Sequence, residues 1–306
     1  MVVSCASIQI DVKKLANLDK DVTPDMEQKE LRVLKNTATE LRMRIIDMIW
    51  KAQSGHPGGS LSVADFVTAC YFRYMNLRPE EPRWPDRDRF VLSKGHVCPA
   101  QYAALAMKGF FPLEVLDTLR KEGSPLQGHP SMNKCPGIDI STGSLGQGLA
   151  CGVGMALAAK LDGKDYRVFC AVGDGECNEG EIWEACGTAH KYKLDNLVVF
   201  VDWNNLQLDG TCEEIMPPVS LAKKFEAFGF EVYECDGNDM AALCEVMNSA
   251  LASKNGLPKA IIGKTVKGKG VSFMENVCSW HGTAPNDAQY RQAMDELNAL
   301  TIKEEA

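Results

Sequence analysis

Apolar residues recur at helical spacing over residues 29–52, at positions that include Leu34, Leu41 and Ile45. This spacing predicts an amphipathic helix that ends before the Gly- and Pro-containing run at residues 54–59. Similar patterns predict a helix that starts at Ser60 or Ser62 and reaches about Met75, and others over residues 99–108, 113–121, 146–161, 179–193, 219–228, 240–253 and from about 285.

Two continuous apolar runs, at residues 167–172 and 197–202, have the length of strands and little polar alternation. Parallel strands that are covered on both faces have this pattern. The helical pattern at 179–193 would connect the two strands as a βαβ unit. Shorter strands are predicted at residues 88–92, 231–234 and 259–266. The elements together predict an α/β fold, with a parallel sheet and helices on both faces.

No repeat, linker or shift in composition divides the chain of 306 residues. We therefore expect a single α/β domain over residues 28–306, preceded by an N-terminal arm at residues 1–27. A hydrophobic content of 45% and a charged content of 24% are ordinary for a globular protein.

The net charge of −8 argues against a nucleic-acid partner, although one basic cluster lies at residues 264–269. No secretory signal and no apolar run long enough to span a bilayer is visible, so we expect no membrane association and a cytoplasmic location. The twelve cysteines are scattered without a CxxC pair, which favours reduced thiols over a disulfide scaffold.

Polar residues follow the two apolar runs at the points where the strands should end. Gly173-Asp174-Gly175 follows the first run, and Asn204-Asn205 follows the second. The carboxyl ends of parallel strands meet at one edge of a sheet, where ligands bind. A carboxylate oxygen of Asp174, an amide oxygen of Asn204 and the carbonyl of Leu206 are hard donors that suit Mg²⁺. With glycines that let a phosphate approach the backbone, the pattern predicts a metal and diphosphate site.

Four of the five histidines lie in turns that contain Gly or Pro, namely His56, His96, His129 and His281. Loops of this kind place side chains rigidly at strand ends, which favours a catalytic or binding role. Zinc ligation is an alternative interpretation of the same histidines. The fifth, His190, falls in the helix predicted at 179–193, where a structural role is more typical.

The run Thr142-Gly143-Ser144-Leu145-Gly146-Gln147-Gly148 comes at the end of a Gly-, Pro- and Ser-rich loop at 122–145. It is either a glycine-rich helix start or a backbone platform for a flat cofactor, with free N–H groups for hydrogen bonding. Glu176 and Glu179 follow the Gly-Asp-Gly turn. Acidic residues early in a helix suit its dipole, so structural and functional roles remain open for both.

These motifs together resemble the amino-terminal half of transketolase. The motifs SGHPGG, DRFVLSKGH, GHP, TGSLGQG, GDGE, NN and WHG occur in that family's order and at similar intervals, from about residue 37 to 285. The resemblance implies the domain that binds the diphosphate of thiamine diphosphate (ThDP), in its ThDP-binding fold. It also implies an enzyme of the pentose phosphate pathway and carbohydrate metabolism that moves a two-carbon ketol unit from a ketose phosphate to an aldose phosphate.

The resemblance further implies roles for individual residues. The ligands of Mg²⁺ or Ca²⁺ would be Asp174, Asn204 and the carbonyl of Leu206. Cofactor contacts would come from His96, Gly143, Ser144, Leu145, Gly175, Asn204, Leu208 and His281. Contacts to the donor sugar would come from His56 and His129, with His281 a candidate for acid–base catalysis. Glu179 is similar to a glutamate at the family's subunit interface.

In this family the glutamate that activates the cofactor pyrimidine belongs to the following domain, and the present sequence ends at Ala306. The resemblance implies that the pyrimidine-binding and C-terminal domains are absent from the chain. We therefore expect the N-terminal subunit of a split transketolase, active with a separately encoded C-terminal subunit, as an α₂β₂ heterotetramer. A truncated piece of a full-length enzyme is the alternative, although the tail at 303–306 is typical of a natural terminus.

Other functions would suit parts of the same pattern. The chain could be the α subunit of a 2-oxo acid dehydrogenase or part of a 1-deoxyxylulose-5-phosphate synthase. The histidines of the SGHPGG and GHP motifs favour ketol transfer, because a sugar offers hydroxyl groups for them to contact. A split enzyme for an unusual branched or modified sugar is a closer alternative, and a non-catalytic remnant would predict a damaged cofactor site.

Overall fold

The computed structural model describes residues 24–303, with side chains described from residue 28. The first helix, α1, spans Pro24–Ala52 and so begins five residues before the predicted start. The rest of the predicted arm and the last three residues of the chain lie outside the described range. Within that range, no helix is both long and apolar enough to cross a bilayer.

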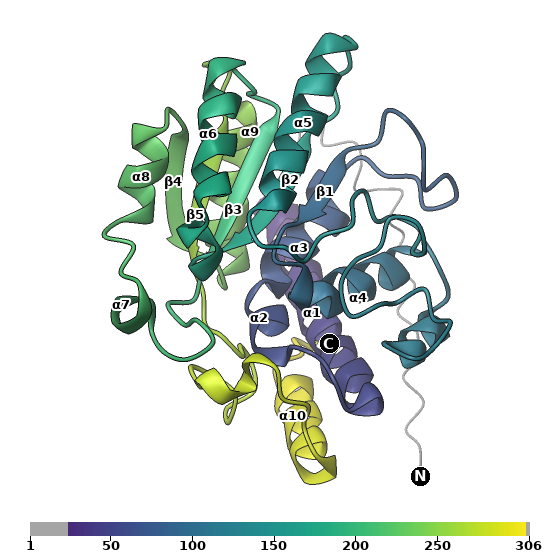
Figure 1. Ribbon diagram of the computed structural model, residues 1–306. Coiled ribbons are helices and arrows are strands. Elements are labelled where there is room, and N and C mark those ends of the chain that lie inside the picture. The colour runs from purple at the N-terminus through teal and green to yellow at the C-terminus, as the bar shows by residue number, and fades with distance from the viewer. Residues whose placement is uncertain (1–23, 304–306) are drawn as a thin grey trace.

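Five parallel strands form one sheet in the order β1-β2-β3-β5-β4 (Figure 1). The strands are β1 Arg89–Leu92, β2 Val168–Gly173, β3 Leu197–Trp203, β4 Glu231–Asp236 and β5 Lys259–Lys264. The central strands β2 and β3 are buried almost throughout, as their continuous apolar sequences predicted. In their register Gly173 pairs with Asp202, so the Gly-Asp-Gly and Asn-Asn turns leave the sheet side by side.

Helices cover both faces of the sheet, which confirms the predicted α/β architecture (Figure 1). Besides α1, they are α2 Pro57–Ser62, α3 Ala64–Ala69, α4 Cys98–Lys108, α5 Gln147–Leu161, α6 Gly180–Lys191, α7 Cys212–Ile215, α8 Leu221–Ala227, α9 Met240–Ala252 and α10 Asp287–Ala299. Alternate strand residues point to opposite faces, as Phe90 and Val91 of β1 illustrate. One core cluster packs α1, α3, α4, α9 and α10 on the first face, and a second packs α5, α6 and α8 on the other.

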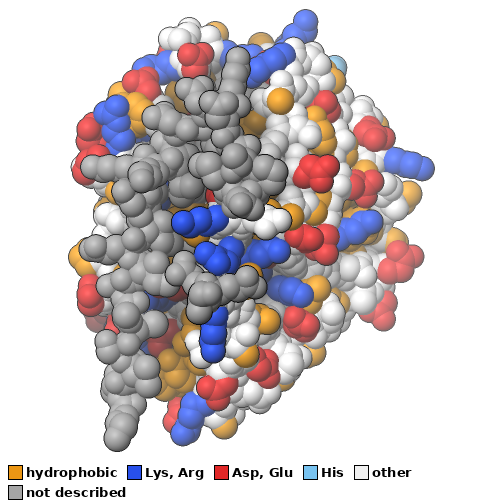
Figure 2. All heavy atoms as spheres, turned by 180° about the vertical axis from the view of Figure 1, so that it is seen from behind, with side chains coloured by type: hydrophobic (Ala, Val, Ile, Leu, Met, Phe, Trp, Pro, Cys, Tyr) orange, Lys and Arg blue, Asp and Glu red, His pale blue; other side chains and the backbone are white. Residues whose placement is uncertain are grey.

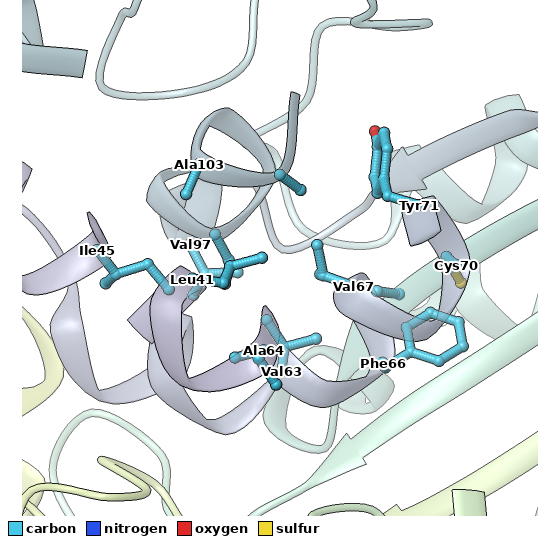
Figure 3. Packing of buried hydrophobic residues seen from close by; sticks show 14 of the residues in the cluster. Leu41, Ile45, Val63, Ala64, Phe66, Val67, Cys70, Tyr71, Val97 and Ala103 are labelled. Atoms are coloured by element: carbon cyan, nitrogen blue, oxygen red, sulfur yellow. The ribbon is translucent and has the colours of Figure 1, made fainter. Parts of the chain in front are cut away.

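The larger core cluster fixes α3 between α1, α4 and the sheet (Figure 3). Phe66 of α3 stacks on Phe200 of β3, with ring centroids 4.2 Å apart and planes 7° from parallel. Burying large apolar side chains in this way contributes about 1.5–3 kcal/mol for each residue. The packing holds the preceding helix α2, and the turn before it, at the carboxyl edge of the sheet.

The structure differs from the predicted helices in four places. The helix after the break begins at Pro57 and not at Ser60 or Ser62; the first turn tolerates proline because its N–H would be unpaired there. It does not continue unbroken to about Met75 but is divided into α2, α3 and a π-helix at Cys70–Tyr74. The segment Leu113–Thr118 is a 3₁₀ helix and not an α-helix. The short helix α7 was not predicted, and a capping box between Thr211 and Glu214 starts it.

The opposite side of the molecule shows Lys and Arg side chains interspersed with Asp and Glu (Figure 2). The eleven cysteines of the described range have free thiols, and eight of them are buried. These buried thiols act as small apolar side chains in the core.

Candidate functional site

Asp174 and Asn204 lie together at the carboxyl ends of β2 and β3. The carboxylate of Asp174 accepts one hydrogen bond from the backbone N–H of Gly175 at 2.7 Å and another from that of Asn205 at 2.6 Å. The amide oxygen of Asn204 accepts from the N–H of Leu206 at 3.1 Å. The predicted donor groups therefore belong to two turns that are bonded to each other.

The donor set of these turns fits a divalent cation. Asp174 is 5% exposed, and its burial together with the negative charge of Asp202 raises its pKa to about 6. A carboxylate offers about four lone-pair directions, and backbone N–H groups use only two of them here. A buried carboxylate with unused lone pairs and an elevated pKa is a favourable place for a hard cation.

The zinc interpretation of the histidines has no comparable support. Among residues 28–303 no group of three or more His, Cys, Asp or Glu side chains is arranged to hold a metal ion. The set of carboxylate, amide and backbone carbonyl is of a different kind, since it is built from hard oxygen donors.

Lys267 is a buried cation beside the same turns, only 2% exposed. Its ammonium group donates to the carbonyls of Leu206 and Gln207, at 3.2 and 2.9 Å, and to Nδ1 of His281 at 3.1 Å. Three acceptors match the three protons of an ammonium group. Sequence reasoning marked the basic cluster at 264–269 but missed this residue's role. The feature of the sequence that could have indicated this role is the position of Lys267 in a Gly-rich loop.

Gln207 and Gly175 complete a surface that suits an anion. The Nε2 group of Gln207 is buried and has no hydrogen-bond acceptor among the described residues. A Cβ atom on Gly175 would lie 3.1 Å from Cγ of Gln207, so the glycine permits a close approach of this side chain. An unpaired buried donor next to the Lys267 ammonium fits the oxygens of a diphosphate.

Three of the four predicted histidines converge on this edge. The ring centroids of His56, His96 and His281 lie 5.1–5.4 Å from one another. Burial is the main cause that lowers their pKa values, to about 4 for His56 and His281 and about 2 for His96. Nearby positive charges add to the effect, so all three rings are neutral at pH 7.

His129 lies on the neighbouring loop and is more exposed than the other three. Its ring packs against Gly143, where a Cβ atom would come within 2.9 Å of it. The hydroxyl of Tyr102 donates to the carbonyl of His129 at 3.1 Å and fixes the turn. Burial and the charge of Arg120 lower the pKa of His129.

The TGSLGQG run crosses the end of β1. Thr142 Oγ1 donates to the carbonyl of Leu92 at 2.6 Å, and a Cβ atom on Gly95 would lie 2.8 Å from the Thr142 backbone. Ser144 is exposed and Leu145 is half-buried on this loop. Leu208, which follows the Asn-Asn turn, is 59% exposed. The contacts of these side chains with a cofactor remain predictions.

The sequence model of the family described as "Transketolase, thiamine diphosphate binding domain" matches residues 33–300. The chain belongs to the transketolase family. The predicted resemblance and the ThDP-binding fold are thereby confirmed. The transketolase of Campylobacter jejuni has the same fold, with a TM-score of 0.82 and 34% identity over 87% of this chain and 43% of that one.

Relatives of similar length are single subunits of transketolases. The chain is 44% identical to one subunit of the apulose-4-phosphate transketolase of Phocaeicola vulgatus, over 89% of this chain and 95% of that one. It is 43% identical to the 6-deoxy-6-sulfo-D-fructose transketolase subunit SqwG of a Clostridium species, over 86% and 96% of the two chains. Against human transketolase the identity is 42%, and the match covers 89% of this chain but 43% of the human protein.

Glu176 joins three loops of this transketolase domain. Its carboxylate, buried at 3% exposure, accepts from the hydroxyl of Ser93 and from the backbone N–H groups of Gly146 and Gly173, at 2.8 and 3.0 Å. This geometry favours the structural interpretation that the sequence left open. Glu179 is exposed at the N-terminus of α6, and its role at a subunit interface remains a prediction.

Asp202 holds a second buried network that the sequence did not reveal. This fully buried carboxylate accepts hydrogen bonds from three side chains. They belong to Lys94 in the loop after β1, to Ser62 at the end of α2 and to Thr265 directly after β5. The buried charges of Lys94 and Asp202 are paired and hydrogen-bonded, as burial requires. The network ties the loops around the site to the central strand β3.

We expect the histidine cluster to make the domain sensitive to acid. A histidine whose pKa lies below 6.5 in the folded state binds protons more readily in the unfolded chain. The free energy of unfolding therefore falls as the pH drops below 6.5, by about 2 kcal/mol at about pH 5 for His96 alone. Urea unfolding at about pH 7 and pH 5 would measure this loss.

The variant His96→Asn should lose less stability between the two pH values than the unsubstituted protein. His190→Asn is the matched control, because His190 lies outside the cluster. Its Nδ1 lies 3.2 Å from the carbonyl oxygen of Gly229. Equal losses in all three proteins would contradict the assignment to His96.

Proposed function

We propose that this chain is the ThDP-binding subunit of a two-subunit transketolase that transfers a two-carbon ketol unit from a ketose phosphate to an aldose phosphate. The observation that carries the proposal is the convergence of Asp174, Asn204, Lys267 and three histidines at one edge of the sheet. The match over nearly the full length of the single-subunit relatives, against partial coverage of human transketolase, supports the division into subunits.

The proposed cofactor site uses the two turns after β2 and β3. Asp174, Asn204 and the carbonyl of Leu206 would hold Mg²⁺ or Ca²⁺, and the metal would bind the diphosphate. The backbone of Gly175, with His96, His281 and Gln207, would contact the phosphate oxygens. The positive charge of Lys267, which donates to protein acceptors beside these groups, would add electrostatic attraction for the diphosphate. Further contacts are proposed for Gly143, Ser144, Leu145 and Leu208. Bound ThDP would supply a thiazolium that stabilises negative charge on the sugar carbon.

The residues proposed to contact the substrate are His56, His129 and His281. As neutral rings they can donate a hydrogen bond to an oxygen on which negative charge develops. His281 is also proposed for acid–base work on a substrate hydroxyl. The low pKa values of His56 and His281 keep this side of the site free of imidazolium charge at pH 7.

The proposed partner is a C-terminal transketolase subunit that brings the glutamate for the pyrimidine, in an α₂β₂ complex of the cytoplasm. The loop after the Asn-Asn turn supports a partner at this edge, because it exposes apolar side chains next to the cofactor site. These are Leu208, Ile215, Met216 and Val219, with 59, 45, 57 and 95% of their surface exposed. Exposed apolar groups in one segment mark an interaction surface.

A modified sugar is the second candidate substrate. The names of two relatives refer to apulose 4-phosphate and to 6-deoxy-6-sulfo-D-fructose, and both relatives match this chain over nearly their full length. Either substrate class leaves the proposed chemistry at the ketol carbon unchanged.

Reconstitution tests the proposal directly. The chain would be purified alone and together with a C-terminal transketolase subunit from the same organism, and each sample assayed with ThDP and Mg²⁺ against a panel of ordinary, branched and sulfonated ketoses. We expect transfer only by the pair. Substantial transfer by the chain alone would refute the two-subunit proposal, and pyruvate turnover without ketol transfer would refute the transketolase assignment.

A further inference from the structure

We propose that Arg120 is a positioning residue that holds the proton of His56 on Nε2 and keeps this ring a hydrogen-bond donor. The residue lies in the turn after the 3₁₀ helix Leu113–Thr118, outside every motif that the sequence singled out. The consequence of this tautomer for catalysis rests on the proposed function.

The contact between the two side chains determines the tautomer. Nη2 of Arg120 lies 3.3 Å from Nδ1 of His56. A guanidinium group only donates hydrogen bonds, so Nδ1 of the neutral ring must accept and the ring proton must lie on Nε2. In proteins, the partner of one ring nitrogen commonly sets the protonation of the other in this way.

Arg120 is held in place from several sides. Nη1 donates to Ser54 Oγ at 2.8 Å, and Nη2 also approaches the carbonyl of Gly128 at 3.5 Å. The backbone N–H of Arg120 donates to the Leu126 carbonyl at 2.8 Å. A Cβ atom on Gly128 would lie 3.3 Å from the Arg120 Nε, so the glycine leaves room for the guanidinium. The arginine thus connects the SGHPGG turn to the QGHP turn.

The positive charge of the Arg120 guanidinium lies next to His56, and no carboxylate of the described residues neutralises it. In the described part of the chain no carboxylate lies within ion-pair distance of Arg120. The other titratable or charged groups that face His56 are His129, Lys267 and the rings of His96 and His281. None of them supplies a negative charge, so protonation of His56 is opposed from every side.

A fixed Nε2–H makes His56 a donor and not a base. An Nε2–H group cannot accept a proton, whereas it can stabilise an oxygen on which negative charge develops. Because Arg120 also raises the energy of the imidazolium, the ring keeps this role across the neutral pH range.

Nitrogen-15 NMR of the histidine-labelled full chain tests the inference. The His56 signals would be assigned by their loss in His56→Gln, and the two ring nitrogens would report the tautomer and its titration. We expect an Nε2–H ring in the unsubstituted protein. In Arg120→Met, we expect a tautomer mixture and a rise of the His56 pKa toward the ordinary value of 6.5. Arg120→Lys, which keeps the charge, should prevent most of this rise.

Two further variants keep the test decisive. Ser54→Ala removes the anchor of Nη1 and should shift the tautomer in the same direction, even if Arg120→Met does not fold. Lys121→Met is the matched control, because this exposed neighbour should leave the ring signals unchanged. An Nδ1–H ring in the unsubstituted protein, or unchanged His56 signals in Arg120→Met, would overturn the inference.

Activity gives a separate outcome in the reconstituted pair. Loss of the hydrogen-bond partner of a metal-binding histidine costs about 10–100-fold in activity, and we expect kcat/KM of Arg120→Met to fall by a similar factor and to develop a new acidic limb. If the pair shows no transketolase activity, the proposed function fails while the NMR result still stands. If NMR shows no change but activity is present, only the role of Arg120 fails.

Discussion

Replacing Asp174 with asparagine is expected to lower ketol transfer by the reconstituted pair by at least about 1,000-fold. Asparagine keeps the shape of the side chain but removes the negative charge, and the proposed metal site contains no second carboxylate to compensate. Initial rates would be measured over a wide range of ThDP and Mg²⁺ concentrations. Saturation of the variant should require much higher concentrations of both.

The same variant separates cofactor binding from folding. The buried carboxylate has a raised pKa, so the folded chain without cofactor does not benefit from its charge. The loss of the Asn205 hydrogen bond works in the opposite direction, by about 1 kcal/mol. We therefore expect the midpoint of urea unfolding to change little. Asp162→Asn, at the far end of α5, is the control, and activity retained in Asp174→Asn would exclude the proposed ligand role.

Replacing Glu176 with alanine is expected to reduce the free energy of unfolding by about 3 kcal/mol, because buried donors left without an acceptor cost about 1–3 kcal/mol each. The backbone N–H groups of Gly146 and Gly173 would both lose their acceptor, and the hydroxyl of Ser93 would lose its partner. Burial raises the pKa of Glu176, so part of the gain from these bonds offsets desolvation of the carboxylate. Urea unfolding at neutral pH would measure the change.

Glu179→Ala is the matched control, because this glutamate lies three residues further along the chain and is exposed. Its effect on the isolated chain should stay within about 0.5 kcal/mol. ThDP affinity should fall in Glu176→Ala as well, since the turns at Gly146 and Gly173 would lose their common anchor. If both variants had the same stability, Glu176 would not hold the loops together.

The sequence determined the main frame of the fold. Continuous apolar runs can be buried only by a sheet covered on both faces, so the strands at 168–173 and 197–203 were predicted to within about one residue. Parallel strands bring their carboxyl ends to one edge, and this alone placed Asp174 near Asn204. Local patterns were less reliable where proline allowed two outcomes, as at Pro57, which starts a helix.

The tertiary structure decided how the site is held and charged. Lys267 reaches Leu206 and His281, and Arg120 reaches His56, across 61, 14 and 64 positions of sequence. Long side chains have many rotamers, and only the packing of the loops selects the one that makes these contacts. The same packing desolvates the histidines and so lowers their pKa values. The sequence thus predicted that the turns of Asp174 and Asn204 meet at the sheet edge. Long-range contacts added Lys267 and Arg120 to them, and burial determined the protonation of the histidines.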